Sequence, residues 1–131
     1  LIPNKNNTLL VTKKVFYFLN KNKIYSYLTT LKEFGKSNSN FLTFPEKGLT
    51  ITLDIPISKN LINAYPLLEK LLLKYKVKIY LAKDSYMSKN FFNKTYYRLN
   101  KFLKIKKLID KNSKFSSIQS RRLGIWQIKF K

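Results

Sequence analysis

The chain has 131 residues, 44% of them hydrophobic and 15% aromatic, which suffices for one domain with a buried core. It contains no cysteine and no histidine. Disulfides, thiolate or imidazole metal sites, cysteine nucleophiles and Ser-His-Asp triads built from these residues alone are therefore excluded. The formal net charge is +21, and no apolar run approaches the roughly 18 residues of a membrane span.

The first half of the chain is expected to combine strands with one helix. Residues 1–3 resemble the tail of a strand. Because the first residue is Leu1 rather than Met, we expect either a processed product or a fragment of a longer protein, and we favour the fragment. Apolar spacing predicts a helix over 8–20, and alternation predicts a strand over 25–33. The clearest strand covers 49–55. Its two faces carry Leu49, Ile51, Leu53 and Ile55 on one side and Thr50, Thr52 and Asp54 on the other.

The second half is predicted to be mainly helical. Ser58 is placed to be the N-cap of a helix that runs to about residue 75, and Pro66 is expected to kink that helix or mark a late start. A further strand is predicted over 77–82. Two shorter helices are predicted over 88–95 and 98–109. These elements together predict an α+β fold with a largely antiparallel sheet and packed helices.

The positive charge has two interpretations. Lys, Asn, Ile, Phe and Tyr make up about half of the chain, against 2 Ala, 3 Gly, 4 Pro and 3 Arg, a composition typical of an AT-rich genome. Such a bias places Lys at tolerant surface positions whatever the function, and the lysines do not form a single stripe. The alternative is a basic RNA-binding protein of the ribosomal type, whose affinity would fall steeply with salt.

Three places could carry chemistry on residue type alone. The polar face of 49–55 could line a site, or it could be a solvated sheet face. Lys83 and Asp84 follow an apolar strand end, although most such pairs are surface ion pairs. Arg121 and Arg122 could clamp an anion, but a solvated pair is the simpler expectation. The six carboxylates are scattered, and none is paired for acid–base work.

Four segments carry a resemblance to a known family. They are Leu31–Gly35 (LKEFG), Gly48–Pro56 (GLTITLDIP), Tyr80–Ser85 (YLAKDS) and Arg121–Gly124 (RRLG). In this order they resemble the C-terminal part of FAD-linked oxidases of the vanillyl-alcohol oxidase superfamily, in the decaprenylphosphoryl-ribose 2-oxidase branch, which is related to the aldonolactone oxidases. Leu49 stands where that family has tryptophan, so the resemblance leaves the substrate open.

The resemblance implies hydride transfer from a secondary alcohol of a sugar or sugar-lipid to flavin N5. Lys83 is expected to be catalytic, because a fixed cation stabilises the negative charge on the reduced flavin. Lys83, Ala82 and Tyr80 are expected to contact the cofactor FAD, and no metal is expected. Asp54 and Asp84 are expected to be structural. The residues expected to contact the substrate are Lys32, Phe34, Thr50 and Thr52, with Lys32 facing a phosphate or a sugar hydroxyl.

The resemblance also implies how the chain is divided. Residues 1–77 would complete a substrate-binding domain, and residues 78–131 would pack on an N-terminal FAD-binding domain that this chain lacks. The expected partners are that domain and a sugar or polyprenyl-phosphate-sugar substrate, with nucleic acid not favoured. The chain alone is expected to be inactive. The expected location is the cytoplasm or the periphery of a bacterial inner membrane.

Overall fold

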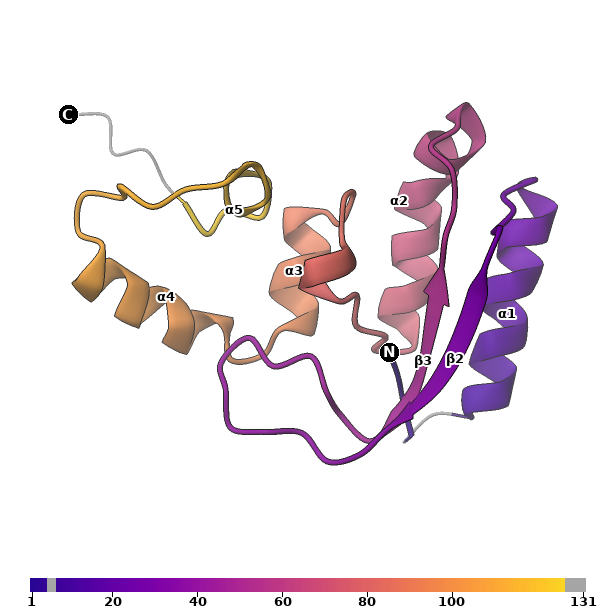
Figure 1. Cartoon of the computed structure of the whole chain (residues 1–131), viewed down its shortest axis with the longest axis horizontal. Coiled ribbons are helices and arrows are strands. Elements are labelled where there is room, and N and C mark those ends of the chain that lie inside the picture. The colour runs from indigo at the N-terminus through magenta and orange to yellow at the C-terminus, as the bar shows by residue number, and fades with distance from the viewer. Residues whose placement is uncertain (5–6, 127–131) are drawn as a thin grey trace.

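The computed structural model describes residues 1–4 and 7–126, and within them it confirms the α+β fold (Figure 1). A small antiparallel sheet of three strands is followed by a helical C-terminal half. The elements are β1 (Ile2–Pro3), α1 (Thr8–Lys21), β2 (Thr29–Phe34), β3 (Gly48–Leu53), α2 (Lys59–Lys74), the 3₁₀ turn η1 (Leu81–Lys83), α3 (Lys89–Thr95), α4 (Leu99–Ile109) and α5 (Ile118–Arg122).

Strand β3 is the centre of the sheet, whose order is β1-β3-β2. Lys32 lies opposite Thr50, and Thr30 lies opposite Thr52. Because side chains alternate along a strand, these four residues share one face. The other face of β3 carries Ile51 and Leu53, which pack against the hydrophobic core. The alternation predicted for 49–55 is therefore confirmed, although the assigned strand ends at Leu53.

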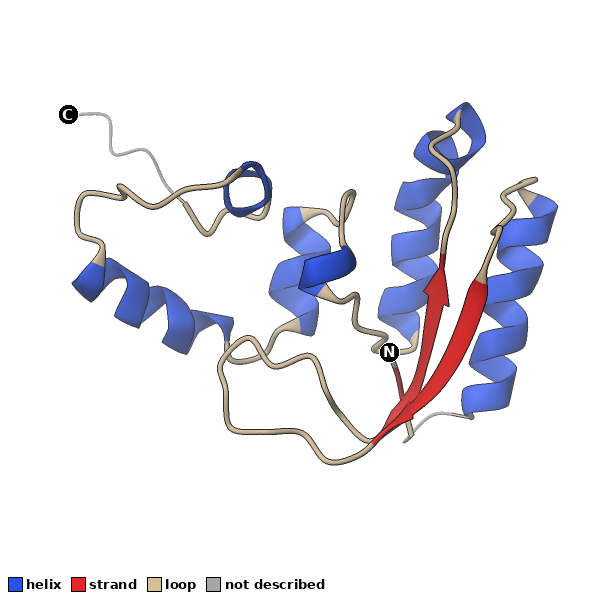
Figure 2. Cartoon of the chain, in the orientation of Figure 1, coloured by secondary structure: helices blue, strands red, loops and turns tan. Residues whose placement is uncertain are grey.

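The helices α1 and α2 flank the strands (Figure 2). Val11, Val15 and Leu19 form the buried side of α1. The predicted N-cap of α2 is confirmed, since Ser58 Oγ accepts the Leu61 N–H at 3.2 Å. Pro66 lies inside this helix and does not mark a late start, because α2 begins at Lys59.

The predicted strand over 77–82 is wrong. Residues 77–80 belong to no helix or strand, and η1 follows directly. Lys78 exchanges two backbone hydrogen bonds with Leu1, at 2.9 and 2.7 Å, which is the bonding of one antiparallel pair. Past Lys78, the described part of the chain offers this segment no partner strand, so a single bridge forms instead of a ladder.

The C-terminal half confirms the helix expected over 88–95, with Ser88 as its N-cap, and the helix expected over 98–109. The short helix α5 was not predicted. Met87, Phe91 and Phe92 are completely buried and belong to the same core cluster as residues of α1 and α2. One core therefore runs across residue 77, and the division into 1–77 and 78–131 stays a prediction.

Candidate functional site

A pocket of about 510 Å³ lies beside β3, between the sheet, α1, α2 and residues 77–83. Its inner wall is apolar and includes Leu19, Ile51 and Leu72. Ala82, which is exposed in η1, is not among the lining residues. Six of the seven residues expected from the sequence do line it: Lys32, Phe34, Thr50, Thr52, Tyr80 and Lys83. The structure thus brings together residues up to 51 positions apart, although their roles stay predictions.

The sheet supplies a polar wall. The buried Thr50 hydroxyl donates to the Lys32 carbonyl at 3.1 Å, so its only proton is already used and it can offer a ligand an acceptor alone. The side chains of Lys32 and Thr52 are exposed on the same face. Lys32 and Thr52 are therefore the two donors that the sheet presents to the pocket.

An aromatic contact links the sheet to the opposite wall. The Phe44 ring packs edge-on against Phe34 at 5.9 Å and tilted against Tyr80 at 4.7 Å, centroid to centroid. Phe44 is buried and lines the pocket. No local signal in the sequence indicated this role, because the partners of Phe44 are distant in sequence.

Lys78 was also missed. Its side chain is only 6% exposed, and its ammonium lies 2.9 Å from the Glu46 carboxylate and 5.2 Å from the Tyr97 ring centroid. This pairing satisfies the charge of a nearly buried lysine at the pocket. Lys78 is therefore a fixed part of the wall.

Lys83 differs from Lys78 in its surroundings. It ends η1, where its N–H donates to the Tyr80 carbonyl at 3.0 Å, and its side chain is exposed. Within residues 1–4 and 7–126, its ammonium makes no hydrogen bond or ion pair. Lys83 thus presents an uncompensated positive charge to the pocket that it lines.

A hydrogen bond from α3 holds the segment that precedes Lys83. The Tyr96 hydroxyl, at the C-cap of α3, donates to the Ile79 carbonyl at 2.7 Å. Burial raises the pKa of Tyr96 well above its usual range, because the phenolate would lose solvation. Tyr96 therefore stays protonated as a donor.

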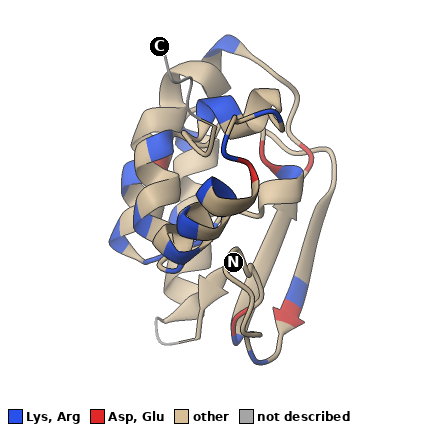
Figure 3. Cartoon of the chain, turned by 90° about the vertical axis from the view of Figure 1, so that its left-hand side faces the viewer, with Lys and Arg blue, Asp and Glu red and all other residues tan. Residues whose placement is uncertain are grey.

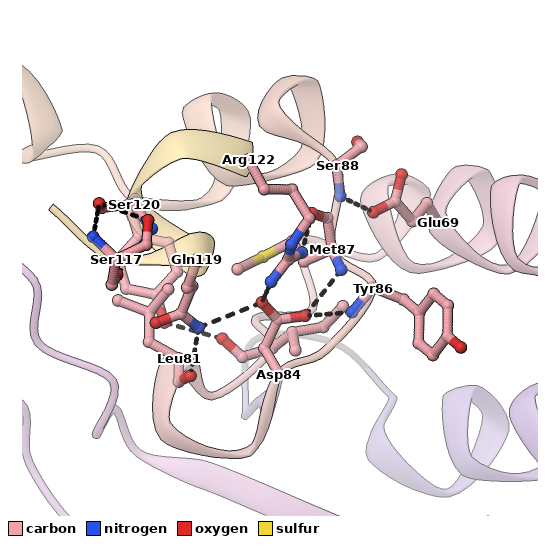
Figure 4. A network of polar contacts seen from close by, with 12 residues as sticks. Glu69, Leu81, Asp84, Tyr86, Met87, Ser88, Ser117, Gln119, Ser120 and Arg122 are labelled. Carbon is pink, nitrogen blue, oxygen red and sulfur yellow. Dashed lines mark hydrogen bonds and ion pairs between the residues drawn. The ribbon is translucent and has the colours of Figure 1, made fainter. Parts of the chain in front are cut away.

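The neighbouring Asp84 is the centre of a buried network (Figure 4). Its side chain is fully buried. One carboxylate oxygen accepts the backbone N–H groups of Tyr86 at 3.0 Å and Met87 at 2.7 Å. The other accepts Arg122 Nη2 at 2.6 Å and Gln119 Nε2 at 3.3 Å. This confirms a structural role for Asp84 in the described structure.

The expectation of a solvated arginine pair is wrong for Arg122. Its side chain is 27% exposed, forms the ion pair with Asp84, and also donates to the Met87 carbonyl. Gln119, on the same helix, donates to the Leu81 carbonyl at 2.6 Å. Arg121 is exposed; it donates to Ser116 Oγ at 2.9 Å and stacks 4.9 Å from the Trp126 ring. Helix α5 therefore fastens η1 from the far end of the chain.

Further features of the described residues concern acidic groups, metal binding, membrane spans and surface charge. No acidic residue lines the pocket in the described residues, and no group of three or more His, Cys, Asp or Glu gathers there to bind a metal. None of the described helices has the length and apolar character needed to span a membrane. Lysines and arginines are spread over several helices, with few acidic residues between them (Figure 3).

Comparison with known proteins tests the family resemblance. No family model matches the chain. Over 113 residues, 86% of this chain, it is 30% identical to the decaprenylphosphoryl-beta-D-ribose oxidase of Mycolicibacterium smegmatis. The chain is homologous to part of this oxidase. It spans a quarter of that relative's length.

This homology confirms the relation to an oxidase of the branch that the motifs resemble. It favours an oxidoreductase over an RNA-binding protein, which stays an untested alternative. The homology does not support the predicted relation to aldonolactone oxidases or the predicted origin in an AT-rich genome, and both stay predictions.

Proposed function

We propose that the chain is part of an FAD-dependent oxidoreductase that oxidises a secondary alcohol of a sugar or sugar-lipid to a ketone. The homology over 86% of the chain supports the oxidase class. The single observation that carries the proposal is the unpaired Lys83 ammonium at the same pocket as Lys32 and Thr52. These residues come from three separate segments, each of which carries a motif that resembles the family.

In this proposal, the residues at η1 would contact the flavin ring. FAD, when bound, accepts the hydride from the alcohol carbon. A cation without a protein partner suits the ring edge on which negative charge develops, and Lys83 provides one. Tyr80 lies at the same wall, and Tyr80 and Ala82 would contact the cofactor beside Lys83. A lysine ammonium suits this role because it acts as a point charge, whereas an arginine is needed only where two hydrogen bonds to one group are required.

The sheet face would hold the substrate. Lys32 and Thr52 are exposed donors on one face, suited to a phosphate or to sugar hydroxyls. Phe34, held by Phe44, offers an apolar surface. Thr50 would act by fixing Lys32 and by accepting a hydrogen bond.

The other partner in the proposal is an FAD-binding domain, because the chain covers only a quarter of its relative. By the same resemblance, residues 78–131 would pack on that domain. A location in the cytoplasm or at the periphery of a bacterial inner membrane is also part of this proposal.

The test uses the complete protein that contains these 131 residues. We expect it to purify with about one FAD per chain and to lose flavin absorbance anaerobically when mixed with a phosphorylated or lipid-linked sugar that has a free secondary hydroxyl. A complete protein that binds no flavin would overturn the oxidase assignment. RNA affinity with a steep salt dependence would then favour the alternative.

A further inference from the structure

Two cations near η1, Lys83 and Arg122, are alternative partners for the Asp84 carboxylate. Lys83 and Asp84 are neighbours in sequence, and an ammonium beside a carboxylate normally forms an ion pair. Here the Asp84 carboxylate is instead filled by four donors: two backbone N–H groups, Gln119 Nε2 and Arg122 Nη2. The Arg122 contact, at 2.6 Å, brings the only positive charge among them.

Arg122 is well suited to hold this carboxylate. Its two terminal nitrogens are both engaged, one with Asp84 and the other with the Met87 carbonyl. A guanidinium fork fixed at two points binds a carboxylate with a defined orientation. Gln119 joins the same carboxylate to the Leu81 carbonyl of η1. Helix α5 therefore fixes both the charge and the backbone next to Lys83.

We propose that Arg122 is a positioning residue that keeps the Asp84 carboxylate away from Lys83, so that the Lys83 ammonium stays free at the pocket. The inference rests on the proposed role of Lys83 for its functional consequence. Without Arg122, the Asp84 charge is uncompensated and captures the neighbouring ammonium. The pocket then loses its free cation while the lysine itself is still present.

The test measures the reactivity of Lys83 in the complete protein. Acetic anhydride acetylates free amines, and peptide mass spectrometry gives the rate at Lys83. We expect Arg122→Gln to slow acetylation roughly two- to fivefold, the range of an exposed ion pair. The matched control is Arg121→Gln, which removes a neighbouring arginine that does not touch Asp84 and is expected to leave the rate unchanged.

A double variant separates capture from general damage. Arg122→Gln combined with Asp84→Asn removes both the Arg122 guanidinium and the Asp84 carboxylate, and we expect the wild-type acetylation rate at Lys83 to return. Damage to the fold would not be repaired by a second loss in the same network. An unchanged or faster rate in Arg122→Gln, or a double variant that stays slow, overturns the proposal.

A single Asp84→Asn variant keeps the proposal testable even if Arg122→Gln does not fold. With Arg122 present, the carboxylate is already occupied, so its loss should change the acetylation rate at Lys83 by less than about twofold. A larger acceleration would show that Asp84 acts on Lys83 despite Arg122, which contradicts the proposal.

The acetylation rates need no flavin, so they are independent of the proposed function. If they follow the expected pattern while substitution of Lys83 leaves flavin reduction unchanged, the positioning stands and the proposed role of Lys83 fails. If Lys83 is required for flavin reduction but Arg122→Gln leaves its reactivity unchanged, the positioning fails and the proposed function stands.

Discussion

The Lys78 ammonium lies 2.9 Å from the Glu46 carboxylate, and this pair connects the loop before β3 to the segment before η1. The lysine side chain is nearly buried, whereas the carboxylate is partly exposed. Removing the carboxylate would leave a buried charge without its partner, which is more costly than replacing the whole pair by apolar groups.

We therefore expect Glu46→Gln to lower the free energy of unfolding by about 1–3 kcal/mol. Lys78→Met should cost less, because it removes the buried charge as well as the pair. Chemical denaturation of the complete protein measures both changes. Glu33→Gln, at an exposed carboxylate on β2, is the control, and equal effects of Glu46→Gln and Glu33→Gln would contradict the prediction.

Gly48 is required for the close approach of β1 and β3. A Cβ at this position would lie 2.1 Å from the Ile2 carbonyl oxygen, which belongs to the backbone. Gly48→Ala is therefore expected to push β1 away from β3 and to destabilise the protein by about 1–3 kcal/mol, as overpacking does. At Gly35 an added Cβ meets nothing within 4 Å. Thermal unfolding should thus show Gly35→Ala close to wild type, and a similar loss for both variants would refute this explanation.

Lys83 is the residue whose loss should most affect the proposed chemistry. In the complete protein, Lys83→Ala is expected to slow reduction of the bound flavin by substrate about 10²-fold, the scale of losing one charge-stabilising donor. The midpoint potential of the flavin should also become more negative. Stopped-flow absorbance measures the rate, and Lys101→Ala, at an exposed lysine of α4 that does not line the pocket, is the control. Near-normal reduction in Lys83→Ala would exclude the role.

The raised pKa of Tyr96 should make the free energy of unfolding depend on pH in the alkaline range. Burial raises its pKa in the folded protein, while in the unfolded chain it is expected near its ordinary value of about 10. The folded state then holds its proton more tightly, so this contribution is fully present below pH ~10 and is lost as the pH rises towards the folded pKa.

The measurement compares wild type with Tyr96→Phe between about pH 9 and pH 11, since the many lysines titrate in both proteins. Tyr96→Phe loses the hydrogen bond to Ile79 and should be less stable by about 1 kcal/mol at neutral pH. The difference should shrink as the pH rises. A constant difference would mean that Tyr96 does not titrate differently in the two states.

Local patterns were enough to predict most of the regular elements. The hydroxyl of Ser58 followed by apolar residues at helical spacing gave the start of α2, and strict alternation gave the faces of β3. Both signals lie within one element. The strand expected over 77–82 did not form for the opposite reason. A strand needs a partner, and among the described residues only Lys78 of this segment has one, in Leu1.

The candidate site was predictable only in part. The resemblance pointed to six residues that meet at one pocket, but it gave no indication of Phe44 or of the Glu46 partner of Lys78. The hydrogen bond from Arg122 to Asp84 spans 38 positions. The residues next to Arg122 in the sequence therefore suggest only a solvated charge. Contacts of this kind depend on how the helical half folds back, which no short sequence window contains.

The brevity of β1 has a consequence for handling the protein. β1 pairs with β3 only at Gly48 and Leu49, so in the described structure the rest of that β3 edge faces the pocket without a strand beside it. Unsatisfied backbone N–H and C=O groups along an edge act as a template for a strand from another molecule. The 131-residue chain, prepared alone, should therefore self-associate in a concentration-dependent way, and short peptides that mimic an adjoining strand should suppress this association.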